Sequence, residues 1–217
     1  ILKIFDFDTP ENNHFLCVRE IWVKGDIYRK RPDIMGFVNG IPLLFIECKN
    51  MHHDLEVAYR KNFSDYLDTI PHIFHHNAII LLGNGEKAKI GSLSSKYGHF
   101  HEWKRLNEDD PGVVDMETLL KGVCEKNNFM DIFENFILFD DSLGPTIKII
   151  GRNHQFLGVN QAIEAVRDRK KREGKLGVFW HTQGSGKSYS MVFFTRKIHR
   201  KLWGNFTFLI CTDRDDL

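Results

Sequence analysis

A glycine-rich run in the last third of the chain has the composition of a phosphate-binding loop. It follows an apolar segment and opens a predicted helix, and its members are Gln183, Gly184, Ser185, Gly186, Lys187 and Ser188. Backbone N–H groups of such a turn bind phosphate, Lys187 would contact the β- and γ-phosphates, and Ser188 would ligate Mg²⁺. The full pattern has glycine at the position of His181, so the run is a variant of it. It predicts a nucleoside triphosphate site.

Gln155 is a candidate for contact with the adenine base of such a nucleotide. It lies 32 residues before Lys187. Its amide donates and accepts hydrogen bonds at once, which suits adenine N6 and N7. The alternative is a solvated surface glutamine, and the sequence leaves both possibilities open.

Asp33, Glu47 and Lys49 form a second group with chemical potential. Asp33 opens one predicted strand, and Glu47 and Lys49 end the next one, after an Asn39-Gly40 turn. An antiparallel hairpin would bring the two carboxylates to the same end, and period-two alternation puts Glu47 and Lys49 on one side. The carboxylates could hold Mg²⁺, and the lysine could stabilise developing charge. Because unpaired charge in an apolar strand costs free energy, phosphodiester cleavage is favoured over a salt-bridged strand end.

Regular elements that could position this second group fill the first part of the chain. Apolar and β-branched patterns predict strands over 14–23, 33–38, 41–48 and 77–83, and a helix over 54–68. The run from Leu43 to Ile46 is continuously apolar, which indicates a strand buried on both faces. The order β-β-β-α-β predicts an α/β core.

The phosphate loop lies in a second predicted domain of opposite charge. Residues 1–150 hold 17 Lys and Arg against 23 Asp and Glu, whereas residues 151–217 hold 13 against 6. Gly144-Pro145 interrupts the pattern, so we expect one domain over 1–145 and another over 146–217. In the second, the expected elements are a helix at 160–173, a strand at 176–181, a helix at 187–202 and a strand at 206–211.

Composition excludes several other classes of protein. The chain is 42% hydrophobic and 27% charged, which is ordinary for a globular domain. No apolar run is long enough for a membrane span, and no secretory signal is visible. The four cysteines form no CxxC pair, so we expect reduced thiols and a cytoplasmic location.

Three stretches of the chain resemble the N-terminal part of the motor (R, or HsdR) subunit of type I restriction enzymes. They are RPDIMGFVNGIPLLFIECKN, DYLDTIPHIFHHNAIILLGNGEKAKIGSL, and GVFWHTQGSGKSYSM with the closing CTDRDDL. The resemblance implies a restriction-endonuclease-like, PD-(D/E)xK mixed-sheet core followed by the beginning of a RecA-like P-loop domain with a parallel sheet. It covers most of the chain from about residue 30 onward.

The resemblance also implies roles for particular residues. Asp33, Glu47 and Lys49 look like the nuclease triad, with Asp33 and Glu47 as metal ligands. The family has a Gln-x-x-x-Tyr motif on the next helix. Tyr66 matches its tyrosine, but Asn62 stands at the glutamine position. Asn62 and Tyr66 are therefore further catalytic candidates.

The implied activity is ATP-dependent translocation of double-stranded DNA with Mg²⁺-dependent endonucleolytic cleavage of unmodified DNA. Implied cofactors are Mg²⁺ and ATP, and implied partners are DNA and the modification (M) and specificity (S) subunits, with no membrane. Gln155 resembles the adenine-contacting residue, and Thr212-Asp213-Arg214 resembles the next helicase motif. No Walker B strand, second RecA-like domain or arginine finger is recognisable, so we expect no ATPase activity from the chain by itself.

Two alternatives remain open from the sequence. A type III restriction or DNA-repair nuclease–helicase subunit would share both groups of residues. A degenerate nuclease fold could instead act as a non-catalytic DNA-binding or assembly module, although the complete set of Asp33, Glu47 and Lys49 disfavours it.

Overall fold

The structure is a computed structural model that describes residues 3–142 and 144–211. The chain forms two compact units, Ile1–Arg152 and Asn153–Leu217. The motif candidate Thr212-Asp213-Arg214 lies outside the described residues. No helix in the described part of the chain is long and apolar enough to cross a membrane.

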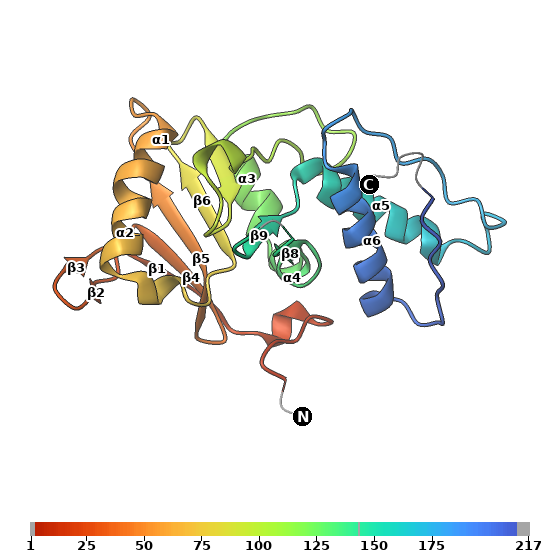
Figure 1. Cartoon of the computed structure of the whole chain (residues 1–217), viewed down its shortest axis with the longest axis horizontal. Helices are drawn as coiled ribbons and strands as arrows, with labels where there is room; N and C mark the ends of the chain where they lie inside the picture. Colours follow the sequence, from red (N-terminus) through yellow and green to blue (C-terminus); the bar gives the residue numbers. More distant parts are fainter. Residues whose placement is uncertain (1–2, 143, 212–217) are drawn as a thin grey trace. The chain divides into compact units, whose positions relative to one another are not determined.

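A five-stranded mixed sheet forms the centre of the first unit (Figure 1). Its strands, in the order β1-β4-β5-β6-β7, are β1 (Phe15–Arg19), β4 (Ile34–Val38), β5 (Ile41–Cys48), β6 (Ile79–Gly83) and β7 (Ala88–Gly91). Only β5 and β6 pair in parallel, and the other neighbours are antiparallel. The predicted mixed α/β core is thereby confirmed.

The turn between β4 and β5 has the conformation that its sequence indicates. Asn39 and Gly40 both have positive φ, 51° and 82°, as a two-residue type I′ hairpin requires. The strands pair antiparallel from Val38 opposite Ile41 to Ile34 opposite Ile46, with an irregularity between Gly36 and Phe37. This hairpin fixes which residues face each other at its open end.

One continuous helical segment connects β5 to β6. It comprises α1 (Leu55–Val57), a π-helical stretch over Ala58–Phe63, and α2 (Ser64–Thr69). Asp54 caps its start by accepting a hydrogen bond from the N–H of Glu56. Parallel strands need such a crossover, and π-helical turns inside helices are frequent at functional sites.

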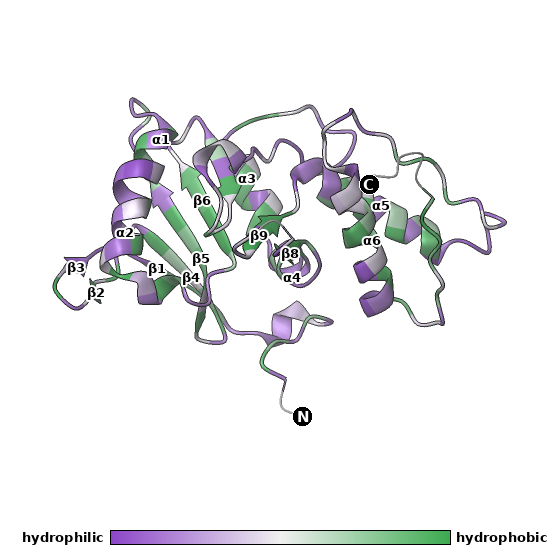
Figure 2. Cartoon of the chain, viewed as in Figure 1, coloured by the Kyte–Doolittle hydropathy of each residue, from purple (hydrophilic) through white to green (hydrophobic). Residues whose placement is uncertain are grey.

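The hydrophobic core lies between this helix and one face of the sheet. Its buried members are Met35, Phe45, Ala58, Phe63, Tyr66, Ile70, Ile73, Phe74, Ile80, Leu82 and Phe100. Figure 2 shows β5 and β6 as largely hydrophobic, and every residue from Leu43 to Glu47 is buried. The predicted burial of this strand on both faces is correct.

The remaining elements of the first unit are peripheral to this sheet. They are β2 (Val23–Lys24), β3 (Arg29–Lys30), α3 (Met116–Val123), α4 (Lys126–Asn135), β8 (Ile137–Asp140), β9 (Ile147–Ile150) and short 3₁₀ turns at Pro10–Asn12, Pro71–Phe74 and Tyr97–His99. The pairs β2-β3 and β8-β9 are separate antiparallel ribbons. The β8-β9 ribbon spans residue 145 and belongs to the first unit.

The second unit departs from the pattern predicted for it. Helix α5 (Asn153–Arg167) begins earlier than predicted, because Phe156, Val159, Ile163 and Val166 share a buried face. Helix α6 (Lys187–Lys201) agrees with the prediction. The predicted strands at 176–181 and 206–211 are wrong, since neither segment has strand structure. A β-strand requires a hydrogen-bonded neighbour, and the described residues provide none for either segment.

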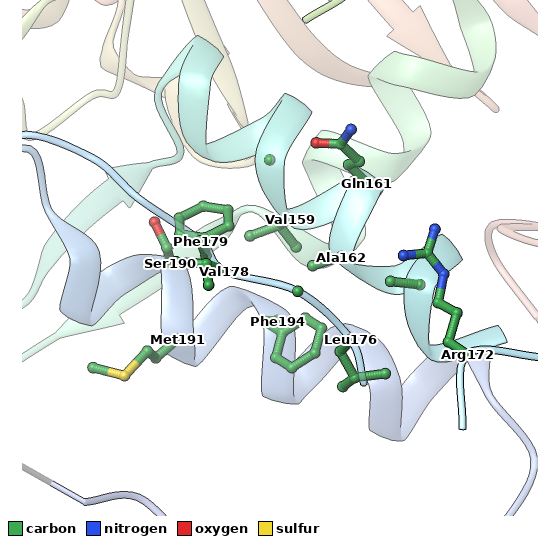
Figure 3. A pocket seen from close by; sticks show the side chains of 13 residues that line it. Val159, Gln161, Ala162, Arg172, Leu176, Val178, Phe179, Ser190, Met191 and Phe194 are labelled. Atoms are coloured by element: carbon green, nitrogen blue, oxygen red, sulfur yellow. The ribbon is translucent and has the colours of Figure 1, made fainter. Parts of the chain in front are cut away.

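A pocket lies between α5, the extended segment 176–179 and α6 (Figure 3). Its volume is about 450 Å³, and apolar side chains such as Val159, Leu176, Phe179 and Phe194 line it.

Val178 and Trp180 are 93% and 77% exposed. A RecA-like parallel sheet is therefore not formed in the described part of this unit, and that assignment remains a proposal.

Candidate nuclease site and phosphate loop

Asp33 and Glu47 lie beside each other at the open end of the β4–β5 hairpin. Asp33 directly precedes β4, and continuation of the register from Ile34 opposite Ile46 places it opposite Glu47. The backbone N–H of Cys48 donates to Asp33 Oδ2 at 2.8 Å. This hydrogen bond holds the Asp33 carboxylate against the last residues of β5.

Lys49 lies on the same side of the strand as Glu47, as predicted by the two-residue period. Its Nζ donates to Glu47 Oε1 at 2.8 Å. The side chain of Glu47 is 1% exposed and that of Lys49 is 18% exposed. The ion pair is therefore largely removed from water. In such surroundings the attraction between the charges offsets the cost of their desolvation only when the geometry is good.

The pKa of Glu47 is strongly perturbed by its surroundings. Burial, with a smaller contribution from the charge of Asp33, raises it to about 7 against the opposing hydrogen bond and charge of Lys49. The other carboxylate oxygen, Oε2, is buried and has no hydrogen-bond partner among the described residues. A buried acceptor without a partner is costly, so this atom has capacity for a further ligand.

Asn62 and Tyr66 complete the cluster from the helical side. They are four residues apart on the π-helical stretch and α2, and so lie on one helix face. The Asn62 amide lowers the pKa of both Glu47 and Tyr66. Burial, followed by the charge of Glu47, raises the pKa of Tyr66 to about 12. The structure thus brings together all five residues that the sequence selected in this unit.

The donor set fits a magnesium ion held by two carboxylates. No group of three or more His, Cys, Asp or Glu in the described part of the chain could hold a metal. Magnesium, however, commonly binds through one or two carboxylates and retains several waters. Glu47 Oε2 has no hydrogen-bond partner in the described part of the chain, and Asp33 lies close enough to Glu47 to perturb its pKa. These two residues would hold the ion.

The glycine-rich run of the second unit forms a loop that leads into α6. Gly184 and Gly186 have φ of 75° and 87°, which only glycine adopts without strain. Gly186 is the N-cap residue of α6. Lys187 Nζ donates to the carbonyls of His181 and Thr182 at 3.0 and 3.1 Å. The lysine thus contacts its own loop, where a phosphate could replace those carbonyls.

Gln155 also contacts this loop. It is 3% exposed, lies in the first turn of α5, and donates from Nε2 to the carbonyl of Gly186 at 2.8 Å. Ser185 Oγ is buried without a partner in the described residues, while Gln183, Gly184 and Ser188 are exposed. The structure therefore places all predicted loop residues around one turn. The Gln155 side chain contacts this turn at the Gly186 carbonyl.

Some contacts around these sites were not found from the sequence. His154 Nε2 lies 3.1 Å from the carbonyl of Ser185, and the Tyr66 hydroxyl donates to the carbonyl of Arg31 at 3.5 Å. A histidine next to a glutamine is a weak signal. The second contact joins residues 35 apart, so only the tertiary structure could reveal it.

The mixed sheet and its carboxylate–lysine cluster define an α/β domain consistent with a nuclease-like fold. Residues 1–99 match the family model described as the N terminus of the type I restriction enzyme R protein. Residues 154–217 match a family described as SWI2/SNF2 ATPase. The chain belongs to the family of type I restriction enzyme R subunits, as a segment from their N-terminal part.

Individual relatives agree with this assignment. The chain is 36% identical, over its whole length, to the type I restriction enzyme HindI endonuclease subunit of Haemophilus influenzae, and covers 22% of that protein. It is 26% identical, again over its whole length, to the putative MjaIXP endonuclease subunit of Methanocaldococcus jannaschii, covering 23%. A Staphylococcus aureus subunit, SauCOLORF180P, is 20% identical over 86% of the chain, which covers 20% of it. The chain thus spans about a fifth of the length of these relatives.

Proposed function

We propose that the first unit is the Mg²⁺-dependent nuclease of a type I restriction enzyme and hydrolyses phosphodiester bonds of double-stranded DNA. The observation that carries this proposal is the buried Oε2 of Glu47, which has no hydrogen-bond partner among the described residues and lies beside Asp33 and Lys49. An ion pair that served packing alone would be expected to satisfy both carboxylate oxygens. A divalent cation would supply the missing partner.

Each residue of the cluster has a distinct role in this proposal. A bound magnesium ion would polarise the phosphate and favour ionisation of a coordinated water. Asp33 and Glu47 would hold the ion, and the hydrogen bond from the Cys48 N–H keeps Asp33 oriented. Lys49 Nζ, held by Glu47 Oε1, can donate to the attacking water or to the phosphate oxygen on which charge develops. Asn62 and Tyr66 border the buried side of Glu47 and limit its access to bulk water.

Replacing Asp33 with asparagine tests this function. The substitution preserves shape but removes one of two negative charges that would hold the metal. We expect DNA cleavage by the complete restriction complex to fall by about a hundredfold or more, measured as plasmid nicking over a Mg²⁺ titration. Asp68→Asn, which alters an exposed aspartate of α2, is the matched control and should cleave normally. Undiminished cleavage by Asp33→Asn would contradict the proposal.

We further propose that the second unit begins the motor that uses ATP to translocate DNA in the complete subunit, together with modification and specificity subunits. The match to SWI2/SNF2 ATPases over 154–217 and the glycine-rich turn before α6 support it. Lys187 and Ser188 would contact phosphate and Mg²⁺. Gln155, near the loop, would contact adenine after releasing Gly186.

Lys187→Ala should weaken ATP binding by the complete subunit by about tenfold to a hundredfold, the value of a hydrogen bond to a charged group. The ammonium group would leave its two loop carbonyls for the more strongly attractive phosphates. Binding of a fluorescent ATP analogue measures the effect. Lys175→Ala, an exposed lysine before the loop, is the control. Equal affinities for both variants and the unaltered subunit would exclude this role.

Asn62→Ala should raise the Mg²⁺ concentration needed for half-maximal cleavage near pH 7. Asn62 lowers the pKa of Glu47, so its loss favours the protonated carboxyl, and metal binding requires the carboxylate. The effect should shrink as the pH rises. Cleavage by the complete complex at several pH values measures it, with Asn62→Gln expected to restore function and Lys61→Ala as a neighbouring control. A pH-independent defect would show that Asn62 acts in another way.

A further inference from the structure

The β2–β3 hairpin places two cations directly opposite each other. Its register pairs Val23 with Lys30 and Lys24 with Arg29, and the N–H of Gly25 closes the turn by donating to the carbonyl of Tyr28 at 2.8 Å. Directly opposed residues of an antiparallel pair project to the same face, and like charges there destabilise the ribbon. Lys24 and Arg29 therefore oppose formation of their own hairpin.

These two cations also lack counter-ions in the described part of the chain, whereas their neighbours have them. Lys30 pairs with Asp65 at 2.6 Å, and Arg31 with Glu20 at 3.5 Å. Lys24 and Arg29 are exposed and form no ion pair with any described residue. A bound anion would relieve their mutual repulsion.

The same hairpin exposes large apolar side chains. Trp22, Ile27 and Tyr28 are 66%, 83% and 55% exposed. Arg31 lies over the Trp22 ring and Lys30 over the Tyr28 ring, at 5.5 and 5.6 Å from the ring centroids. Aromatic rings alternating with cations match the needs of nucleic acids, whose phosphates and bases require both kinds of contact.

The hairpin is fixed close to the candidate nuclease site. Figure 1 shows β2 and β3 outside the five-stranded sheet, beside the end of α2. A Cβ on Gly25 would lie 2.2 Å from the carbonyl of Thr69, so the turn packs tightly on that helix end. Arg31 precedes Asp33 by two residues, a separation of at most about 7 Å along the chain. Phosphates along one DNA strand rise about 3.4 Å each, so the hairpin could contact phosphates near the scissile bond.

The local charge distinguishes the hairpin from its surroundings. Residues 19–31 hold five Lys and Arg against two Asp and Glu, within a part of the chain that is net acidic. This local positive charge would attract a polyanion to the hairpin, although the first unit as a whole is net acidic.

We propose that this hairpin binds the DNA backbone beside the scissile phosphodiester, with Lys24 and Arg29 on phosphates and Ile27 and Tyr28 against the adjoining sugars and bases. This inference rests on the proposed nuclease function and adds a binding element to it. Through its attachment to α2 and Asp33, the hairpin would place the DNA strand over the two carboxylates.

The test is the salt dependence of DNA binding by the complete subunit carrying Lys24→Ala and Arg29→Ala. Binding is measured in metal-free buffer, where no cleavage occurs. The negative slope of log affinity against log salt concentration should become less steep by about 2, and the affinity should fall on the order of tenfold. A fluorescent duplex and a single strand of equal length are the two probes. The probe that loses more affinity is the form of DNA that the hairpin contacts.

The matched control removes two cations elsewhere in the same unit, with Lys104→Ala and Lys121→Ala. Both are in ion pairs with glutamates, so the slope should not change. Thermal unfolding verifies folding, and loss of the opposed charges should leave the transition equal or higher. An unchanged salt slope in the hairpin variant overturns the proposal. If the slope is unchanged and the variant no longer assembles into the restriction complex, the hairpin is a protein contact instead. Neither outcome depends on the Asp33→Asn cleavage result, which tests the nuclease itself.

Discussion

Glu47→Gln is expected to abolish metal-dependent cleavage while stabilising the metal-free fold above pH 7. Glutamine keeps the shape of the side chain and can still accept from Lys49 Nζ, but it carries no charge to bind Mg²⁺. We expect plasmid cleavage by the complete complex to decrease by about a hundredfold or more. Glu56→Gln, at the start of the helical segment that follows β5 and in an ion pair with Arg60, provides the matched control.

The stability effect follows from the sign of the pKa shift. Because burial raises the pKa of Glu47 from 4.5 to about 7, the folded state binds its proton more tightly than the unfolded state. Its contribution is complete below pH 4.5 and is lost as the pH rises through 7. The loss is on the order of 3 kcal/mol, from about 1.4 kcal/mol per pKa unit, and glutamine avoids it.

Hydrogen exchange of amides in β5 and β6 measures this difference between pH 5 and 8, without and with Mg²⁺. Unaltered chain should lose stability relative to Glu47→Gln as the pH rises. Added Mg²⁺ should restore stability only where Glu47 is present, since ligand binding to the folded state stabilises it. A pH-independent difference between the two chains would contradict the assigned ionisation. Stabilisation of both by Mg²⁺ would place the metal elsewhere.

Phe45→Ala should lower the stability of the first unit by about 3–5 kcal/mol. Phe45 is 1% exposed, and its ring centroid lies 5.1 Å from that of Phe74 and 5.9 Å from that of Tyr66. Removing the ring leaves a cavity between the sheet and α2. Since Phe45 faces the same side of β5 as Glu47, the cavity should also loosen Tyr66 and impair cleavage.

Urea unfolding, monitored through the hydrogen exchange of amides in β5 and β6, measures this loss for the first unit alone. Phe139→Ala is the control, because Phe139 is 68% exposed in β8; it should cost less than about 1 kcal/mol. A loss below 1 kcal/mol for Phe45→Ala would mean that the helix does not pack on this face as described.

The local sequence determined much of the first unit. The Asn39-Gly40 turn predicts its own conformation and the antiparallel hairpin. The irregularity between Gly36 and Phe37 shifts the register by one residue, and this shift brings Asp33 opposite Glu47, which the sequence did not indicate. Alternation along β5 puts Lys49 with Glu47. The turn and the alternation depend on residues close in sequence, so turn chemistry and side-chain periodicity suffice to predict these two features.

The tertiary structure decided what depends on distant neighbours. Predicted strands at 176–181 and 206–211 do not form in the described residues, because an apolar run becomes a strand only when another strand satisfies its backbone. The unpartnered Oε2 of Glu47 and the repulsion of Lys24 by Arg29 follow from packing and pairing of whole segments. Composition indicates that charges exist, but only the fold determines which of them lack a partner, because burial and register set the cost of each one.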